Sequence, residues 1–530
     1  MDNKTQDIDE IEIAIDRAFS DNPIAKLPYS QAIWTLLAGA EEYHFRHSVV
    51  HPATEAEMAV VVDGLLNALT YPVRTVYKNC VRDSTPINFD LNDYNYEKSV
   101  EWIGGAEDYL QFCSIFPLYR RKQITIEVKG NEILIHRKSP KNIAYEAYDR
   151  FIGKRGEMDV ILADPTPLVP SLLGKMHRNG NSFQIKFTRR LVEGIVRVFG
   201  PQYLSRFVLP PHWKFVYFDI AQFKLTMACL QSLASAWMVA RQLFAEQGIL
   251  GAGYSSSVLI IKIAELENII FQSTKIDKIK IQSILKYLTF GQCEIRDPDI
   301  AIQPIINLEN GSYAISPLLL MHTNAERNLC VLLNQIPLEK KNYSFLVQEK
   351  ESELFNRIVK SLANTSFDFR SGKIHGTDID IAIIDRSNKV CLCLELKWFI
   401  EPAEIREVEM RSDEVAKGIK QGLKLMHLFE VQDQKLFTTL GVDASFDFQA
   451  AVGSENFIGR EDIQDKRIPV LRVWHLISHL VTGDLNSTVD WLRQRKYLPK
   501  EGRDFEVRTM PITVGGWRAE WYGLRPLESS

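Results

Sequence analysis

Three carboxylates and one amine lie close together in residues 376–399, which read GTDIDIAIIDRSNKVCLCLELKWF. They are Asp378 and Asp380 on one arm of this stretch and Glu395 and Lys397 on the other. Grouped carboxylates repel one another and raise each other's pKa unless a cation balances them. Mg²⁺ is a natural partner, because it binds a few carboxylate oxygens and keeps positions open for water and phosphate. These residue types predict metal-assisted chemistry on a phosphate, with the lysine close to the reacting water.

A β-hairpin would hold these side chains in place. Both arms are rich in Ile, Val, Leu and Cys, and residues 386–389 form a polar break between them. With a four-residue loop, Asp380 faces Glu395 and Asp378 faces Lys397. Opposed residues share a face and side chains alternate along a strand, so all four charges are expected on one face. The opposite face is apolar and must be covered by protein: Ile379, Ile381, Ile383, Leu392, Leu394 and Leu396.

An alternative is an edge hairpin whose charged face is simply solvated, with acids and lysine paired across the strands. Against this, the same face continues as an apolar strip in both arms, with Ala382 and Ile384 on one and Cys391 and Cys393 on the other. A solvated face would be polar along its length. The pattern therefore favours a site at one end of a buried strand pair.

The order Asp380, then Glu395-Leu396-Lys397 on the next strand, resembles the active-site signature of the PD-(D/E)XK nuclease superfamily, which includes many restriction and repair nucleases. The resemblance implies that Asp380 and Glu395 bind Mg²⁺, or Mn²⁺ in its place, together with the main-chain carbonyl of Leu396. It implies that Lys397 positions or activates the attacking water. Asp378 would be a second acid or an alternative occupant of the Asp position. Neither aspartate follows a proline, a departure that many members share.

The resemblance covers about residues 345–481 and extends to the order of elements. The pattern predicts, in order, a helix, three strands, a helix and two strands, at residues 348–362, 366–370, the two hairpin arms, 412–429, and from 446 and 468. The family's first helix sometimes contributes an acid, here Glu351 or Glu353. On the second helix, Lys417, Gln421 and Lys424 could line a substrate groove or form an ordinary solvated face.

At 530 residues, the chain should contain two or three domains. We expect a boundary near residues 337–343, which separates an N-terminal region of unknown function, residues 1–335, from a nuclease-like domain with a C-terminal extension, residues 336–530. The N-terminal region is predicted to be helical and then mixed, with a β-hairpin at residues 123–138 and a buried helix at 225–240. The fold class is mixed α and β, and the C-terminal domain is expected to be a restriction-endonuclease-like mixed sheet flanked by helices.

A second ExK pattern, Glu127-Val128-Lys129, occurs in the predicted N-terminal hairpin, and Glu157 and Asp159 follow in another strand-like run. The order is reversed relative to the nuclease pattern. Lys129 also abuts the turn at Gly130. An ordinary sheet is the better interpretation.

Composition places this site in an ordinary globular protein. The net charge of -4 does not indicate an overall affinity for nucleic acid, so a surface that binds nucleic acid would have to be local. Seven cysteines form no CxxC pairs, and the acidic start of the chain has no secretory signal pattern. These features predict reduced thiols, a cytoplasmic location and no membrane segment.

The expected function is a Mg²⁺-dependent nuclease that hydrolyses nucleic acid, with DNA as the expected substrate. The superfamily's habits suggest a restriction or anti-phage defence setting. The N-terminal region would then recognise a target or partner protein, or form a homo-oligomer. The alternative is a catalytically silent protein of the same fold that binds nucleic acid or acts as an interaction partner in a larger complex.

Overall fold

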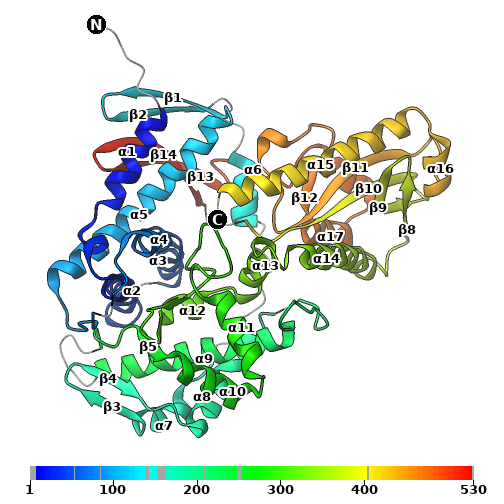
Figure 1. Ribbon diagram of the computed structural model, residues 1–530. Helices are drawn as coiled ribbons and strands as arrows, with labels where there is room; N and C mark the ends of the chain where they lie inside the picture. Colours follow the sequence, from blue (N-terminus) through cyan, green and yellow to red (C-terminus); the bar gives the residue numbers. More distant parts are fainter. Residues whose placement is uncertain are drawn as a thin grey trace.

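The computed structural model describes residues 8–52, 54–83, 85–137, 143–152, 163–207, 209–246, 253–402 and 405–527. In this part of the chain, helices predominate at the N-terminal side and strands form four sheets. Figure 1 shows two groups of elements, with the blue to green helices in one and a yellow to orange sheet flanked by helices in the other. The mixed α and β fold class is confirmed.

The first group of helices packs around one core. These helices are α1 (Ile8–Ser20), α2 (Tyr29–Phe45), α3 (Glu55–Ala68), α4 (Thr70–Asn79) and α5 (Asp93–Arg120). Helix α2 is apolar almost all round, as expected of a helix buried on every side. Helix α1 is attached to α5 by Phe19, which stacks on Tyr109 with ring centroids 4.0 Å apart.

A second core follows in the chain. Its helices and short strands are α7 (Val169–Leu173), β3 (Met176–Asn179), β4 (Ser182–Ile185), α8 (Arg189–Leu204), α9 (Ile220–Ala245), β5 (Leu259–Lys262), α10 (Ile263–Thr274), α11 (Lys278–Leu288), β6 (Ile305–Asn307), β7 (Ser312–Ile315), α12 (Pro317–His322) and α13 (Ala325–Gln335). The predicted buried helix is α9, whose start is capped by Asp219. In the described part of the chain, no helix combines the length and apolarity that crossing a lipid bilayer needs.

The part of the chain that the resemblance predicts to be nuclease-like, called the nuclease-like domain below after that prediction, contains a five-stranded sheet in the order β12-β11-β10-β9-β8. Its strands are β8 (Asp368–Ile374), β9 (Thr377–Asp385), β10 (Val390–Trp398), β11 (Asp447–Glu455) and β12 (Val470–Arg472). Strands β8, β9 and β10 are antiparallel, whereas β10, β11 and β12 are parallel. The sheet is mixed, as expected.

Helices cover both faces of this sheet. They are α14 (Lys340–Ser361), α15 (Ile405–Glu430), α16 (Gln434–Leu440), α17 (Val473–Thr482) and α18 (Leu485–Arg493). Helix α15 lies on one face, where Gly418 meets Glu395, and α17 lies on the other, where Val473 packs beside Gly453 and Leu396. The predicted order of helices and strands is present, and α14 and α15 are longer than predicted.

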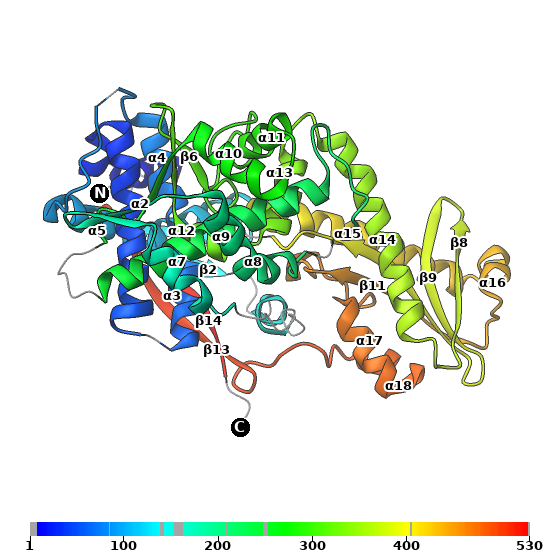
Figure 2. The same cartoon turned by 90° about the horizontal axis from the view of Figure 1, so that it is seen from below.

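The C-terminal tail does not extend the nuclease-like domain, contrary to the predicted division at residue 336. Its strands β13 (Phe505–Val514) and β14 (Trp517–Pro526) join the hairpin of β1 (Ile124–Lys129) and β2 (Glu132–Arg137) in one sheet, through β14 and β2. Their apolar residues are buried in the same core as helices α1 to α5. In Figure 2, the red strands β13 and β14 lie among the elements of the N-terminal region. The pairing joins segments far apart in the chain, which local pattern does not reveal.

The start of α14 is anchored to the N-terminal region. Glu339, just before this helix, is fully buried, and its carboxylate accepts hydrogen bonds from the Val216 N–H at 3.0 Å and the Tyr287 hydroxyl at 2.8 Å. The polar run predicted as a boundary is therefore a packed junction between α13 and α14.

A short segment of the N-terminal region also inserts into the nuclease-like domain. It comprises α6 (Ile143–Ala147) and the π-helical turn η4 (Tyr148–Ile152). Tyr148 is fully buried, with its hydroxyl 2.9 Å from His475 Nδ1. The Asp149 carboxylate accepts hydrogen bonds from Arg472 Nη2 at 2.6 Å and from the Ile458 N–H at 3.1 Å. Burial raises the pKa of Asp149 to about 6, although Arg472 favours its charged form. We call Tyr148 and Asp149, with their partners Arg472, His475 and Ile458, the clasp.

Removing the Asp149 carboxylate should destabilise the protein strongly. In Asp149→Ala, the guanidinium of Arg472, whose side chain is 5% exposed, stays buried without its partner. Breaking such a buried pair costs about 3–5 kcal/mol, and the urea midpoint of unfolding should fall accordingly. Asp21→Ala, which breaks an exposed ion pair with Lys26, is the control and should leave the midpoint almost unchanged. Equal midpoints for the two variants would contradict a stabilising clasp.

Candidate active site

The predicted hairpin register is confirmed along most of β9 and β10. The ladder pairs Val390 with Asp385 and ends with Leu394 opposite Ile381. Asp380 and Glu395 lie immediately beyond this last pair. Strand β10 continues to Trp398, paired only with β11 on its other side. Strand β9 therefore leaves β10 at the charged residues, and one edge of β10 faces the gap between them.

In this gap, carboxylates take the place of a neighbouring strand beside the backbone N–H groups of β10. The Leu396 N–H donates a 2.7 Å hydrogen bond to Asp380 Oδ2, and the Trp398 N–H lies near the carboxylate of Glu351 on α14 and favours its charged form. A buried strand N–H without a partner is costly, so these acids replace the missing strand. In an antiparallel strand, the N–H and C=O of one residue point to the same neighbour. The carbonyl of Leu396 therefore faces the same gap as Asp380.

Glu395 and Lys397 lie on the face of the sheet that α15 covers. Lys397 Nζ donates a 2.6 Å hydrogen bond to Glu395 Oε1, and the two side chains are 17% and 3% exposed. A Cβ placed at Gly418 of α15 would stand 3.3 Å from Glu395 Cγ and 3.3 Å from Val452 Cγ2. The helix thus packs directly on the Glu395 side chain. Glu395 Oε2 is buried and accepts no hydrogen bond from an N–H or hydroxyl group of the described residues, and the side chain interacts with the carboxyl group of Asp380.

The remainder of this face is buried. Ala382, Ile384, Cys391 and Cys393 are all fully buried, so the alternative of a solvated hairpin face is wrong. The apolar strip predicted from the sequence is part of the core beneath α15.

Burial and mutual repulsion shift the ionisation of this cluster. Burial, followed by the charge of Asp380, raises the pKa of Glu395 to about 7. Burial also raises the pKa of Asp380, although the Leu396 N–H and Lys397 favour its charged form. Burial alone would lower the pKa of Lys397, but its attraction to Glu395, Glu351 and Asp380 prevails and the pKa is raised. Near neutral pH, Lys397 is protonated and Glu395 is poised between its two forms.

Asp378 does not join this cluster. Its side chain is 53% exposed and lies 3.9 Å from Lys373 on β8. Sequence reasoning placed it opposite Lys397, but β9 has already left β10 at that point and Lys397 pairs with Glu395 instead. Asp378 acts on the site only at a distance, by raising the pKa of Asp380 slightly further.

Glu351 is the residue that sequence reasoning could not single out. Its pKa is raised by burial, and it interacts electrostatically with Lys397 and Asp380. Glu353, the other candidate on α14, forms an ion pair with Lys350 at 2.8 Å and is absent from the cluster. The sequence correctly indicated that the helix before the hairpin contributes an acid, but only tertiary packing decides that this acid is Glu351 and not Glu353.

The second ExK pattern is an ordinary surface pair. Lys129 lies 3.2 Å from Glu127 and both side chains are more than half exposed. Glu157 and Asp159 lie outside the described residues. Nothing in the described part of this hairpin forms a buried carboxylate cluster.

The donor set at the gap fits a small hard cation. Among the described residues, no group of three or more His, Cys, Asp or Glu side chains is arranged to hold a metal ion. Asp380, Glu395 and the Leu396 carbonyl are a smaller set, of the kind Mg²⁺ accepts because it retains several waters. The orphaned Glu395 Oε2 supports the fit, since a buried carboxylate oxygen without a donor is stabilised by a cation. The residues present therefore fit Mg²⁺ or Mn²⁺.

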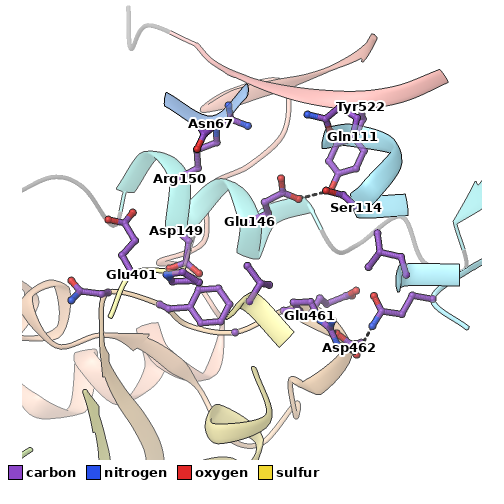
Figure 3. A pocket seen from close by; sticks show the side chains of 18 of the residues that line it. Asn67, Gln111, Ser114, Glu146, Asp149, Arg150, Glu401, Glu461, Asp462 and Tyr522 are labelled. Atoms are coloured by element: carbon purple, nitrogen blue, oxygen red, sulfur yellow. Dashed lines mark hydrogen bonds and ion pairs between the residues drawn. The ribbon is translucent and has the colours of Figure 1, made fainter. Parts of the chain in front are cut away.

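A separate cavity of about 610 Å³ lies between the N-terminal region and the nuclease-like domain. Figure 3 shows Glu146, Asp149 and Arg150 on one wall, with the Glu146 carboxylate accepting a 2.5 Å hydrogen bond from the Tyr522 hydroxyl. Asp380, Glu395, Lys397 and Glu351 do not line it. The cavity shares a wall with the clasp, and the carboxylate cluster is a different site.

Comparison with known proteins adds no name to this site. No family model, no curated protein and no solved structure matches the chain.

The raised pKa of Glu395 predicts a pH-dependent stability difference without divalent cations. The native state holds this proton up to about pH 7, whereas the unfolded chain releases it near 4.5, so this contribution to stability is lost as pH rises between those values. Relative to the unaltered protein, Glu395→Gln should gain up to about 3 kcal/mol between pH 4.5 and pH 8. Urea unfolding in EDTA measures the difference, with Glu430→Gln, the same substitution at an exposed position, as a control that keeps the unaltered profile. A difference independent of pH would contradict a buried, ionising Glu395.

Proposed function

We propose that this protein is a Mg²⁺-dependent nuclease of PD-(D/E)XK type that hydrolyses phosphodiester bonds of nucleic acid, with DNA as the substrate. One observation carries the proposal. Where β9 leaves β10, Glu395, a buried carboxylate with one oxygen that lacks a donor, lies beside a second acid, the Leu396 carbonyl at the strand edge and the ammonium group of Lys397. This combination suits a metal-bound phosphate.

The residues would divide the work as follows. Asp380, Glu395 and the Leu396 carbonyl would hold the ion. When bound, Mg²⁺ supplies positive charge that offsets the charge of the phosphate during in-line displacement. Lys397 keeps its proton at neutral pH, since its pKa is raised further above an already basic ordinary value, and it would act as a donor that orients water or phosphate. Glu351 holds the Trp398 N–H and thereby the strand that carries Lys397.

The wider setting is proposed on the resemblance. We propose a restriction or anti-phage defence role. In that role, the N-terminal region would recognise a target, a partner protein or a second copy of the chain. The cytoplasm is the proposed location, in keeping with seven free cysteines.

A catalytically silent protein of the same fold is the second candidate. The direct ion pair between Lys397 and Glu395 favours it, because this pair balances the carboxylate's charge without a metal. Such a protein would bind nucleic acid or a protein partner and leave phosphodiester bonds intact.

Cleavage assays test the two candidates. Linear, circular and single-stranded DNA and RNA are incubated with the protein and Mg²⁺, Mn²⁺ or EDTA. We expect metal-dependent cleavage, reduced about 100-fold or more in Glu395→Gln and Lys397→Met, because each removes a group that acts on the reacting phosphate or water. Glu353→Gln, the same substitution outside the cluster, should retain full activity. Cleavage that persists in EDTA would contradict the proposal, and binding without cleavage would support the silent protein.

Glu351 and Asp378 should differ in their effect on cleavage. Glu351→Gln weakens an acid that supports the strand edge and should lower the rate or the affinity for Mg²⁺ by about 10-fold or more. Asp378→Asn alters an exposed side chain outside the cluster and should leave both near their unaltered values. Mg²⁺ titrations of cleavage rate measure both effects. If Asp378→Asn lowered the cleavage rate or the affinity for Mg²⁺ more than Glu351→Gln does, Asp378 rather than Glu351 would belong to the metal site.

A further inference from the structure

Large apolar side chains are exposed together where the N-terminal region meets the start of α14. Leu338 and Phe345, at and just before the first turns of this helix, are 54% and 63% exposed. Val216 and Tyr217, in the segment before α9, are 46% and 52% exposed. A single exposed apolar residue is ordinary, whereas a group of them beside polar residues marks a site of interaction. We call these four residues the apolar patch.

Val216 and Tyr217 lie at the tip of a tight turn. At its base, the Phe215 N–H donates a 2.8 Å hydrogen bond to the Phe218 carbonyl, and both phenylalanine side chains are buried. The tips of turns favour Gly, Pro, Asn, Asp and Ser, which adopt turn conformations readily or bond their own backbone. Local structure therefore does not call for two large apolar residues at this exposed tip.

The turn is anchored beside the start of α14. The Val216 N–H donates a 3.0 Å hydrogen bond to the buried carboxylate of Glu339, so the tip lies next to Leu338, the preceding residue of the chain. The ring of Phe218 packs on Tyr287 of α11, with ring centroids 5.1 Å apart. Because the turn is held on two sides, it has little conformational entropy left to lose when a partner binds.

Phe345 lies on the side of α14 that follows this same segment. Asn342 donates a 2.8 Å hydrogen bond from its side chain to the Lys214 carbonyl, and the Glu349 carboxylate accepts a 3.3 Å hydrogen bond from Trp213 Nε1. Phe345 is three residues after Asn342 and four before Glu349, and such residues share one side of a helix. The two halves of the apolar patch therefore adjoin.

Positive charge surrounds the apolar patch. Lys214 flanks the turn, Lys340 and Lys341 lie between Leu338 and Phe345, and all three lysines are exposed. The one acid in residues 214–217 and 338–345 is Glu339, which is fully buried. The local charge is thus opposite to the net charge of the chain, -4. A partner of complementary charge would be acidic.

The side chains of the patch favour a protein partner over other acidic molecules. Single-stranded nucleic acid stacks its bases on aromatic rings, but half of the patch is aliphatic, namely Val216 and Leu338. Elements that lie on a membrane are long amphipathic helices, whereas this patch joins a turn to the start of a helix. Protein interfaces combine an apolar centre with a polar rim, which the patch and its lysines match.

We propose that the apolar patch and its three lysines bind a segment of a partner protein that carries both acidic and large apolar side chains. Apolar side chains of the partner would pack on Tyr217 and Phe345, and its carboxylates would face Lys340 and Lys341. This inference goes beyond the proposed function, because it assigns a partner chemistry to a surface outside the carboxylate cluster. It holds whether or not the cluster cleaves nucleic acid.

Peptide selection tests the proposal. A phage library of random 16-residue peptides is selected against the immobilised full-length protein in EDTA, without nucleic acid. The enriched peptides are synthesised with a fluorescent label and titrated by anisotropy over a KCl series. We expect peptides that combine Asp or Glu with Leu, Phe or Trp, and we expect their binding to weaken as salt screens the charges.

Two double variants separate the apolar from the charged contribution. Tyr217→Ser/Phe345→Ser and Lys340→Glu/Lys341→Glu should each weaken peptide binding about 10-fold or more, because each removes contacts at the centre or the rim of the patch. Val431→Ser/Val481→Ser, which alters two apolar residues that are 57% and 60% exposed elsewhere, is the matched control and should bind as the unaltered protein does. Unchanged urea midpoints establish that the variants fold, as expected for exposed positions.

Four results would overturn the proposal. They are the absence of enriched peptides, enriched peptides without an excess of acids, acidic peptides that bind Tyr217→Ser/Phe345→Ser as tightly as the unaltered protein, and occupation of the patch by another molecule. The last is measured with phosphatidylglycerol vesicles, a single-stranded oligonucleotide and sedimentation of the protein alone. Vesicle binding, oligonucleotide binding or self-association that is lost in Tyr217→Ser/Phe345→Ser, without peptide binding, would assign the patch to a lipid surface, nucleic acid or a second copy. Cleavage assays decide the proposed function separately, so either proposal can fail alone.

Discussion

The departure of β9 from β10 beyond the pair Leu394–Ile381 is the constraint on which the site depends. A strand inside a covered sheet cannot leave its N–H groups unpaired, and here two carboxylates take the place of the missing strand. Asp380 accepts a hydrogen bond from the Leu396 N–H, and the Trp398 N–H favours the charged form of Glu351. The gap between β9 and β10 would weaken a sheet that had only a structural role. Here it is lined by acids from β9 and α14, and the Leu396 carbonyl lies beside them.

Helix α15 buries one of these acids and thereby raises the electrostatic repulsion between them. Gly418 allows the helix to lie on Glu395, so this carboxylate loses its water while facing Asp380. Lys397 relieves part of the repulsion through one oxygen and leaves the other without a donor. The repulsion persists because strands β9 and β10 are held by the core beneath them. A divalent cation would relieve the repulsion that Lys397 leaves, and the proposed metal site rests on this point.

The N-terminal region braces the nuclease-like domain at several places. Glu339 anchors the start of α14, and the clasp holds the end of β12 through Arg472. Ser454, beside Arg472 in the sheet, is also the neighbour of Lys397 in β11, so the clasp lies two strands from the site. The cavity between the two parts shares Asp149 with the clasp. The described part of the N-terminal region is thus packed against the domain that contains the carboxylate cluster.

Local pattern was enough to predict the hairpin, its register as far as Leu394, the apolar strip beneath α15 and the order of elements around them, because strand alternation and turn residues act between near neighbours. Asp380, Glu395 and Lys397 followed from the same alternation. Only tertiary packing decided that Asp378 lies outside the cluster, that Glu351 rather than Glu353 enters it, and that β13 and β14 pair with the N-terminal hairpin. Each of these depends on where a strand bends or which distant surface covers it, and such contacts join residues whose separation in the chain carries no periodic signal.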